Sequence, residues 1–169
     1  MALPEAELLS RYRDWRCFST LTWSGQTPSA VAQKKLLFSY LYETKYVTGI
    51  PFSRLVWCSR HELGEVGGRE HYHLLLGSND WIPTLGQMFQ LNQLWDSLPR
   101  CGFARHYIFD QSLNGVGYVT KCLTSRSTKD RRAADSYESG KFGHAESQVT
   151  LSNSFGRLIG GRRVGVLRH

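Results

Sequence analysis

Two histidines separated by a single residue, His71 and His73, carry the clearest chemical signal in this sequence. The apolar run His-Tyr-His-Leu-Leu-Leu that they open predicts a β-strand. Side chains alternate between the two faces of a strand, so both imidazoles should project from one face and Tyr72 from the other. Neighbouring imidazoles suit a divalent metal ion. The pattern alone is weak, because paired histidines on a strand also occur as ordinary surface residues.

A third metal ligand is expected from the preceding strand, which ends with Arg-His-Glu at 60–62. A glycine-rich connection of hairpin length follows, so pairing across the hairpin would bring Glu62 near the two histidines. His61 and Glu65 are the alternative third ligands. Two histidines and one carboxylate leave positions open for substrate oxygens. Such a set fits Mn²⁺, or Mg²⁺ when phosphate supplies further oxygens.

A second candidate site lies downstream, where Tyr118 and Lys121 are spaced i, i+3 in a segment that reads as a helix. Residues at that spacing share a helix face. A phenol is a weak nucleophile at neutral pH because its pKa is about 10. A nearby metal ion or ammonium group favours the phenolate, which could attack phosphorus and form a phosphotyrosine. Lys121 could neutralise a phosphate oxygen. The spacing is also common by chance, and a helical tyrosine is usually a packing residue.

The hydrophobic pattern predicts the elements that position these residues. Strands are expected over 16–23, 54–62, 71–76 and 103–110, and helices over 30–46, from Thr84 to Leu98 and over 114–123. The second helix should begin with a capping box at Thr84 and turn Leu85, Met88, Phe89 and Trp95 toward the core. The order of elements predicts an α+β fold, a central antiparallel sheet with helices packed on one face.

Composition indicates one basic domain. The chain has 169 residues, 41% of them hydrophobic, and a net charge of +7, so it can bury a core and attract nucleic acid. Arg54, Arg69, Arg105 and the basic run 126–132 are candidates for phosphate contacts. Residues 125–169 are rich in glycine, serine and arginine and should form a basic extension of a domain at 1–124.

The cysteines and the hydropathy pattern favour an intracellular protein. None of the four cysteines forms a Cys-x-x-Cys pair, so a zinc ribbon is not indicated, and three of the four lie in apolar segments, as buried thiols do. We find no apolar stretch of membrane-spanning length and no signal-peptide pattern.

The motifs, in this order, resemble those of the HUH endonucleases, in particular the single-tyrosine initiators of rolling-circle replication (Rep). The family's first motif, a hydrophobic strand with a threonine near its end, is similar to Phe-Ser-Thr-Leu-Thr-Trp at 18–23. Its second, a His-hydrophobic-His strand preceded by an acidic residue, matches 71–73 with Glu62 upstream. Its third, Tyr-x-x-Lys on a helix, matches 118–121. The resemblance covers about residues 16–124 and implies an RRM- or ferredoxin-like nuclease fold.

This resemblance implies an enzyme that nicks and rejoins single-stranded DNA at an origin, using Mg²⁺ or Mn²⁺. Tyr118 would hold the 5′ end as a phosphotyrosine, assisted by Lys121, while Glu62, His71 and His73 would bind the metal. The DNA partner would be an origin hairpin or nick site. No Walker A pattern follows the nuclease region, so this chain does not supply the helicase that many viral Reps carry. The alternatives are a truncated nuclease domain and a stand-alone initiator or transposase relative, with a host helicase and a polymerase as candidate partners. A viral, plasmid or mobile-element protein that acts where that DNA replicates is expected.

A non-catalytic module that binds single-stranded nucleic acid is the main alternative. RRM-like domains share the same order of elements and stack bases on sheet aromatics. The absence of a Lys/Arg-Gly-Phe-Gly-Phe signature counts against this alternative. A metal-dependent hydrolase of small phosphoesters is a third, weaker alternative. Only the nickase would leave protein covalently attached to DNA.

Overall fold

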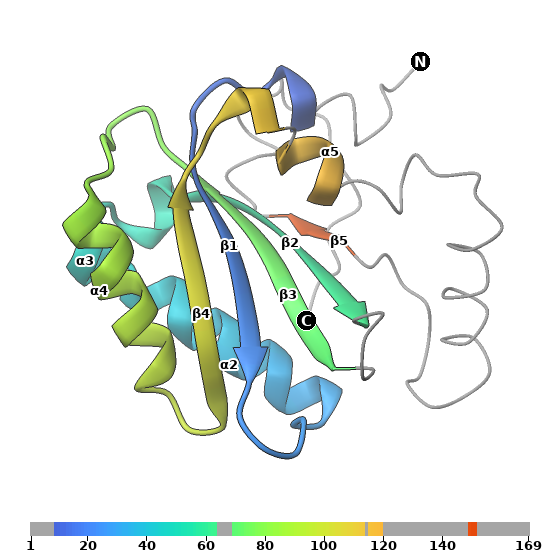
Figure 1. The fold of residues 1–169 in the computed structure, drawn as a ribbon. Coiled ribbons are helices and arrows are strands. Elements are labelled where there is room, and N and C mark those ends of the chain that lie inside the picture. The colour runs from blue at the N-terminus through green and yellow to red at the C-terminus, as the bar shows by residue number, and fades with distance from the viewer. Residues whose placement is uncertain (1–8, 64–68, 114, 120–148, 152–169) are drawn as a thin grey trace, which may run out of the picture.

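The computed structural model describes residues 9–63, 69–113, 115–119 and 149–151 (Figure 1). Their elements are β1 (Trp15–Trp23), α2 (Ala30–Glu43), α3 (Lys45–Thr48), η1 (Phe52–Arg54), β2 (Val56–Leu63), β3 (Glu70–Gly77), α4 (Leu85–Asp96), β4 (Cys101–Ile108), η2 (Gln111–Leu113), α5 (Gly115–Val119) and β5 (Val149–Leu151). The strands form one antiparallel sheet in the order β4-β1-β3-β2-β5. The predicted α+β class, with helices packed on an antiparallel sheet, is confirmed. The specific nuclease fold stays a prediction.

The register of three central strands determines which residues share a face. In the β2–β3 hairpin, Glu62 pairs with His71 and Arg60 with His73. On the other side of β3, Thr20 of β1 also pairs with His73. Residues that are directly opposite in neighbouring strands point to the same side of a sheet. We call the side that carries these five residues the histidine face.

Helices α2 and α4 cover the opposite side of the sheet, here called the helix face (Figure 1). Cys17 and Leu21 of β1 are buried in the core beneath these helices. The largest fully buried side chains of this core are Leu21, Tyr40, Leu41, Leu55, Leu74, Leu76, Trp81, Leu91 and Trp95. Removing their apolar surface from water stabilises the sheet, and a well-packed sheet holds the residues on its other face in fixed positions.

The prediction for the inward face of α4 was wrong for two of the four residues named. Leu85 and Phe89 are 79% and 62% exposed, whereas Met88, Leu91 and Trp95 are buried. Consecutive helical residues are rotated by about 100°, so Phe89 cannot share the stripe that begins at Met88. Leu85 is the first residue of the helix and precedes this stripe.

Helix α5 packs on the histidine face rather than on the helix face. Its Val119 is buried in a cluster with Cys58 and Leu75, and Val116 packs against the same cluster. The prediction that all helices share one face was therefore wrong for α5. The reason is that β2 and β3 expose a second apolar patch on the histidine face, which needs its own cover. Because His73 lies two residues before Leu75 on the same strand face, α5 ends up beside the histidines.

Two further expectations concern the cysteines and the membrane. Burial was expected for three of the four cysteines, and Cys17, Cys58 and Cys101 are buried, while Cys122 lies outside the described residues. Among the helices described, none has the length and apolar character needed to cross a membrane.

Candidate metal centre

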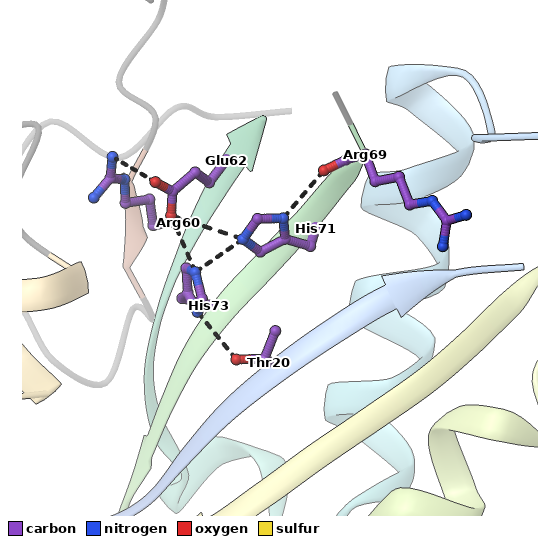
Figure 2. Close-up of polar contacts among 6 residues, drawn as sticks. All are labelled: Thr20, Arg60, Glu62, Arg69, His71 and His73. Carbon is purple, nitrogen blue, oxygen red and sulfur yellow. Dashed lines mark hydrogen bonds and ion pairs between the residues drawn. The ribbon is translucent and has the colours of Figure 1, made fainter. Parts of the chain in front are cut away.

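Glu62, His71 and His73 each direct one donor atom to a common point on the histidine face (Figure 2). The two Nε2 atoms lie 3.0 Å apart. Oε2 of Glu62 lies 3.0 Å from Nε2 of His73 and 3.8 Å from Nε2 of His71. Neighbouring ligands of an octahedral ion with bonds of about 2.1 Å lie about 3.0 Å apart. The three residues predicted as ligands therefore come together at distances that fit a divalent cation.

The second nitrogen of each imidazole has a partner of its own. Nδ1 of His71 lies 3.2 Å from the carbonyl oxygen of Arg69, and Nδ1 of His73 lies 3.2 Å from Oγ1 of Thr20. A carbonyl only accepts, so His71 carries its proton on Nδ1 and keeps a lone pair on Nε2. The Thr20 hydroxyl can accept a proton from His73 in the same way. This arrangement is the one that metal-binding histidines usually have.

The charges at the centre also suit a cation. The close contact with His73, whose Nε2 lies 3.0 Å from Oε2, is the main cause that lowers the pKa of Glu62, and the guanidinium of Arg60 lowers it further. Burial lowers the pKa of His71 below its usual value, so this imidazole is neutral at pH 7. An ionised carboxylate and a neutral imidazole are the forms that bind metals. Lone pairs and a carboxylate that converge in this way are stabilised by a cation between them.

One of the two alternative ligands, His61, points away from the histidine face. His61 lies on the helix face, where its Nε2 is 3.0 Å from Oε2 of Glu70, so it is not part of the cluster. The other alternative, Glu65, lies outside the described residues. Gln33 of α2 donates to the same Glu70 oxygen at 2.6 Å.

The Gln33–Glu70–His61 group was missed in the sequence. Gln33 is 1% exposed, and its place between Ala30 and Leu37 on the helical stripe is the signal that could have revealed it. Its pairing with Glu70 ties the start of α2 to the end of the hairpin that carries the metal ligands.

For Tyr118, the nucleophile expected from the sequence, the structure describes the backbone and not the side chain. Tyr118 belongs to α5, which contacts β3 and β2, the two strands that carry Glu62, His71 and His73. Helix α5 is thus on the same face as these ligands. The side chain of Tyr118 and the whole of Lys121 lie outside the described part of the chain, so the convergence of the phenol with the metal ligands stays a prediction.

A strip of exposed side chains on β4 continues the histidine face beyond β1. Phe103, Arg105 and Tyr107 alternate along the strand, and Arg105 and Tyr107 pair with Thr20 and Phe18 of β1. Phe103 is 62% exposed and Tyr107 is 53% exposed. The guanidinium of Arg105 lies 5.3 Å from the Phe103 ring centre. We call these three residues the β4 strip.

The other arginines named from the sequence have different surroundings. Arg54 forms an ion pair with Asp80, and Arg69 is exposed next to His71, to which it offers its carbonyl oxygen. The run 126–132 lies outside the described residues. Of the candidates that the structure describes, Arg105 is the one that shares a strand face with the metal ligands.

Comparisons of this chain with protein-family models, with curated proteins and with solved structures found no match. Any functional conclusion therefore depends on the residues of this chain and on their geometry.

Proposed function

We propose that this chain is a metal-dependent endonuclease of the HUH replication-initiator type, which nicks and rejoins single-stranded DNA at an origin. The observation that carries the proposal is the convergence of Glu62, His71 and His73, with both imidazoles turned by their Nδ1 partners so that Nε2 faces the same point. Helix α5, which contains Tyr118, packs on the same sheet face and supports the proposal.

In the proposed reaction, the Tyr118 oxygen attacks the scissile phosphorus and the bond from phosphorus to the 3′ oxygen breaks. The tyrosine loses its proton, the 3′ oxygen leaves as a hydroxyl, and the 5′ end becomes a phosphotyrosine. Rejoining is the reverse exchange, with a 3′ hydroxyl as the attacking group, so neither water nor an oxidant is consumed. Lys121 is proposed to neutralise a phosphate oxygen.

The residues of the centre fit Mg²⁺ or Mn²⁺, held by Glu62, His71 and His73. When bound, such an ion supplies positive charge that polarises a phosphoryl oxygen and favours a phenolate. The carbonyl of Arg69 keeps His71 in the tautomer that can hold it, and the Thr20 hydroxyl can accept from His73 in the same tautomer.

The β4 strip supports single-stranded DNA as the substrate. Unpaired bases stack on exposed aromatic rings, and a neighbouring arginine adds cation–π and phosphate contacts. Phe103 and Tyr107 are more than half exposed and lie on the same face as the proposed metal centre. A strand that follows β4 would run past this centre. A host helicase and polymerase are proposed as the partners that use the released 3′ end.

The proposal is tested by incubating the protein with a pool of single-stranded oligonucleotides and Mn²⁺ and separating the products on a denaturing gel. We expect a covalent protein–DNA band that disappears in EDTA and in Tyr118→Phe. Tyr107→Phe is the matched control, because it removes a phenol hydroxyl from the same sheet face and should leave the band unchanged. A band of normal intensity in Tyr118→Phe would contradict the proposed nucleophile.

A non-catalytic single-strand-binding module is the second candidate, favoured by the exposed aromatic rings of the β4 strip. It predicts DNA binding with no covalent band under any of these conditions.

A further inference from the structure

A cavity of about 200 Å³ lies at the end of the sheet where β1 begins and β4 ends, and the reaction above assigns it no role. Its walls come from the segment before β1, from the connection between β4 and α5, and from α5, which contributes Val116. Figure 1 shows these parts of the chain together at one end of the sheet. The cavity thus adjoins the helix that contains Tyr118.

An irregularity in β1 places the cavity on the histidine face. The pairing of β1 with β3 shifts its register between Trp15 and Cys17. In a regular strand these two side chains would point to the same side, whereas Cys17 belongs to the core of the helix face and Trp15 packs with Leu75 and Val119. Such irregularities re-aim a side chain. The shift therefore makes Trp15 a wall of the cavity on the side of the sheet that carries the metal ligands.

The β4 strip leads to this cavity. Phe103, Arg105 and Tyr107 alternate along one side of β4, and Phe109 is the next residue in that alternation. Its N–H donates to the carbonyl oxygen of Arg16 at 2.8 Å, so the pairing of the two chain segments continues past the end of β4. The Phe109 ring packs against the apolar cluster of the histidine face and lines the cavity. A single strand of DNA that follows the β4 strip therefore reaches the cavity.

Three aromatic side chains of the lining, Tyr12, Trp15 and Phe109, suit a base. The Tyr12 and Trp15 rings pack edge to face with centroids 4.8 Å apart, and the Trp15 indole N–H donates to the carbonyl oxygen of Leu9 at 3.1 Å. These contacts hold the two rings in place. Unpaired bases stack on such rings. The amide of Gln111, also in the lining, offers a donor and an acceptor to the edge of a base.

Two arginines of the lining differ in what they can offer an anion. Nη2 of Arg16 lies 2.9 Å from Oδ1 of Asp14, and its Nε donates to the carbonyl oxygen of Ser78 at 3.2 Å. Arg13 is exposed, and within the described part of the chain its guanidinium has no ion pair or hydrogen bond. The planar fork of an arginine matches phosphate oxygens, so Arg13 can bind a phosphate at the mouth of the cavity.

The dimensions limit the ligand to one unit of a strand. Pockets for drug-sized ligands have about 300–1,000 Å³, so a space of about 200 Å³ suits a single base. Four positions along β1 separate Arg16 from Thr20, which pairs with His73, and this is about 13 Å along the strand. At about 3.4 Å per stacked nucleotide, roughly four nucleotides cover that distance.

We propose that the cavity holds one unpaired nucleotide of the substrate strand, a few positions from the scissile phosphate, with its base among the rings and its phosphate on Arg13. The identity of the strand as substrate DNA rests on the proposed function. The chemistry of the cavity identifies a nucleotide by itself, because rings, an amide and an arginine suit a base and a phosphate together.

The experiment uses the full chain in EDTA, so that no metal ion contributes to phosphate binding. Deoxyadenosine 5′-monophosphate, deoxyadenosine and deoxyribose 5-phosphate are each titrated into ¹⁵N-labelled protein, and shifts of its amide and indole N–H signals give the affinities. We expect the nucleotide to bind more tightly than either half. Arg13→Ala should weaken nucleotide and sugar phosphate about tenfold, as the loss of one charged hydrogen bond implies, and leave deoxyadenosine unchanged. Gln111→Leu should weaken nucleotide and deoxyadenosine about fivefold and leave the sugar phosphate unchanged.

Arg11→Ala is the matched control, because it removes the same charge from an exposed position two residues away that does not line the cavity. It should keep all three affinities. An equal loss in Arg11→Ala would overturn the proposal, because any nearby positive charge would then serve. A wild type that does not bind the nucleotide would also overturn it. Equal affinities for nucleotide and sugar phosphate would do the same and make the cavity a phosphate site.

Arg13 and Gln111 are exposed, so both variants should fold, and thermal unfolding checks this. If one of them unfolds, the other decides the case with its own pair of ligands. The covalent band is assayed separately. Nucleotide binding without a band would contradict the nuclease and leave the cavity proposal intact, whereas a normal band without nucleotide binding would do the reverse.

Discussion

At the scale of single residues, the centre depends on side chains that orient the ligands as well as on the ligands themselves. The His-x-His spacing and the acidic residue upstream were visible in the sequence, and the structure brings His71, His73 and Glu62 together. The contact of Thr20 with His73 was not visible, because it depends on the register between β1 and β3. Strand register comes from the packing of whole strands and not from local residue spacing.

The contact from Thr20 leads to a first prediction. Thr20→Val keeps the shape of the side chain but removes the oxygen that faces Nδ1 of His73, so Mn²⁺ affinity should fall about tenfold or more. Isothermal titration calorimetry measures the Mn²⁺ affinity. Thr22→Val is the matched control, because Thr22 lies on the same face of β1 but donates to the carbonyl of Phe103. Equal Mn²⁺ affinities for the two variants would rule out the role of Thr20.

At the scale of elements, features within one strand or helix were more predictable than the packing of one element against another. The capping box at Thr84 and Gln87 was read correctly, because both partners lie within one helical turn. The exposure of Phe89 and the packing of α5 on the histidine face were not predicted. Both depend on which surfaces neighbouring elements leave open, a property that hydrophobic periodicity does not encode.

The link between α2 and the hairpin provides a second prediction. Gln33→Leu removes the donor to the buried Glu70 carboxylate, so the free energy of unfolding should fall by about 1–3 kcal/mol. Gln90→Leu makes the same change at an exposed position of α4 and should alter it by no more than about 0.5 kcal/mol. Urea unfolding compares the two. If Gln33→Leu and Gln90→Leu had the same free energy of unfolding, the link between Gln33 and Glu70 would contribute nothing to stability.

The β4 strip provides a third prediction. Phe103→Ala and Tyr107→Ala should each weaken the binding of a single-stranded oligonucleotide by about 1–3 kcal/mol, because a stacked base loses its ring partner. Fluorescence anisotropy at one fixed salt concentration measures the affinity. Phe89→Ala is the control, because Phe89 on α4 is also 62% exposed and lies away from the histidine face. A similar loss in this control would mean that the strip has no special part in binding.

At the scale of the whole molecule, one buried polar network joins three elements on the helix face. Nε2 of His106 accepts from the Tyr40 hydroxyl at 2.5 Å, and its Nδ1 donates to Oδ1 of Asn92 at 2.6 Å. These residues come from β4, α2 and α4. The neutral imidazole satisfies both of its ring nitrogens in this network. Burial lowers the pKa of His106 to about 3, so protonation in acid favours the unfolded chain.

This network leads to a fourth prediction, with a definite sign. The unfolded histidine titrates near pH 6.5, so the stability that neutral His106 contributes is complete above that pH and is lost as the pH falls toward 3. Between pH 7.5 and 5, the wild type should lose about 2 kcal/mol more than His106→Gln, which cannot titrate. Urea unfolding at the two pH values checks this. Identical losses for both proteins would contradict the proposed neutral state.

The central claim is that Glu62, His71 and His73 hold a divalent ion that faces the hydroxyl of Tyr118. The most direct measurement is the anomalous diffraction of crystals soaked in Mn²⁺. We expect one anomalous peak within about 2.3 Å of both Nε2 atoms and of a Glu62 oxygen, with the Tyr118 hydroxyl directed toward it. A Mn²⁺ peak elsewhere with this centre empty, or a Tyr118 hydroxyl that points to the far side of α5, would contradict the account.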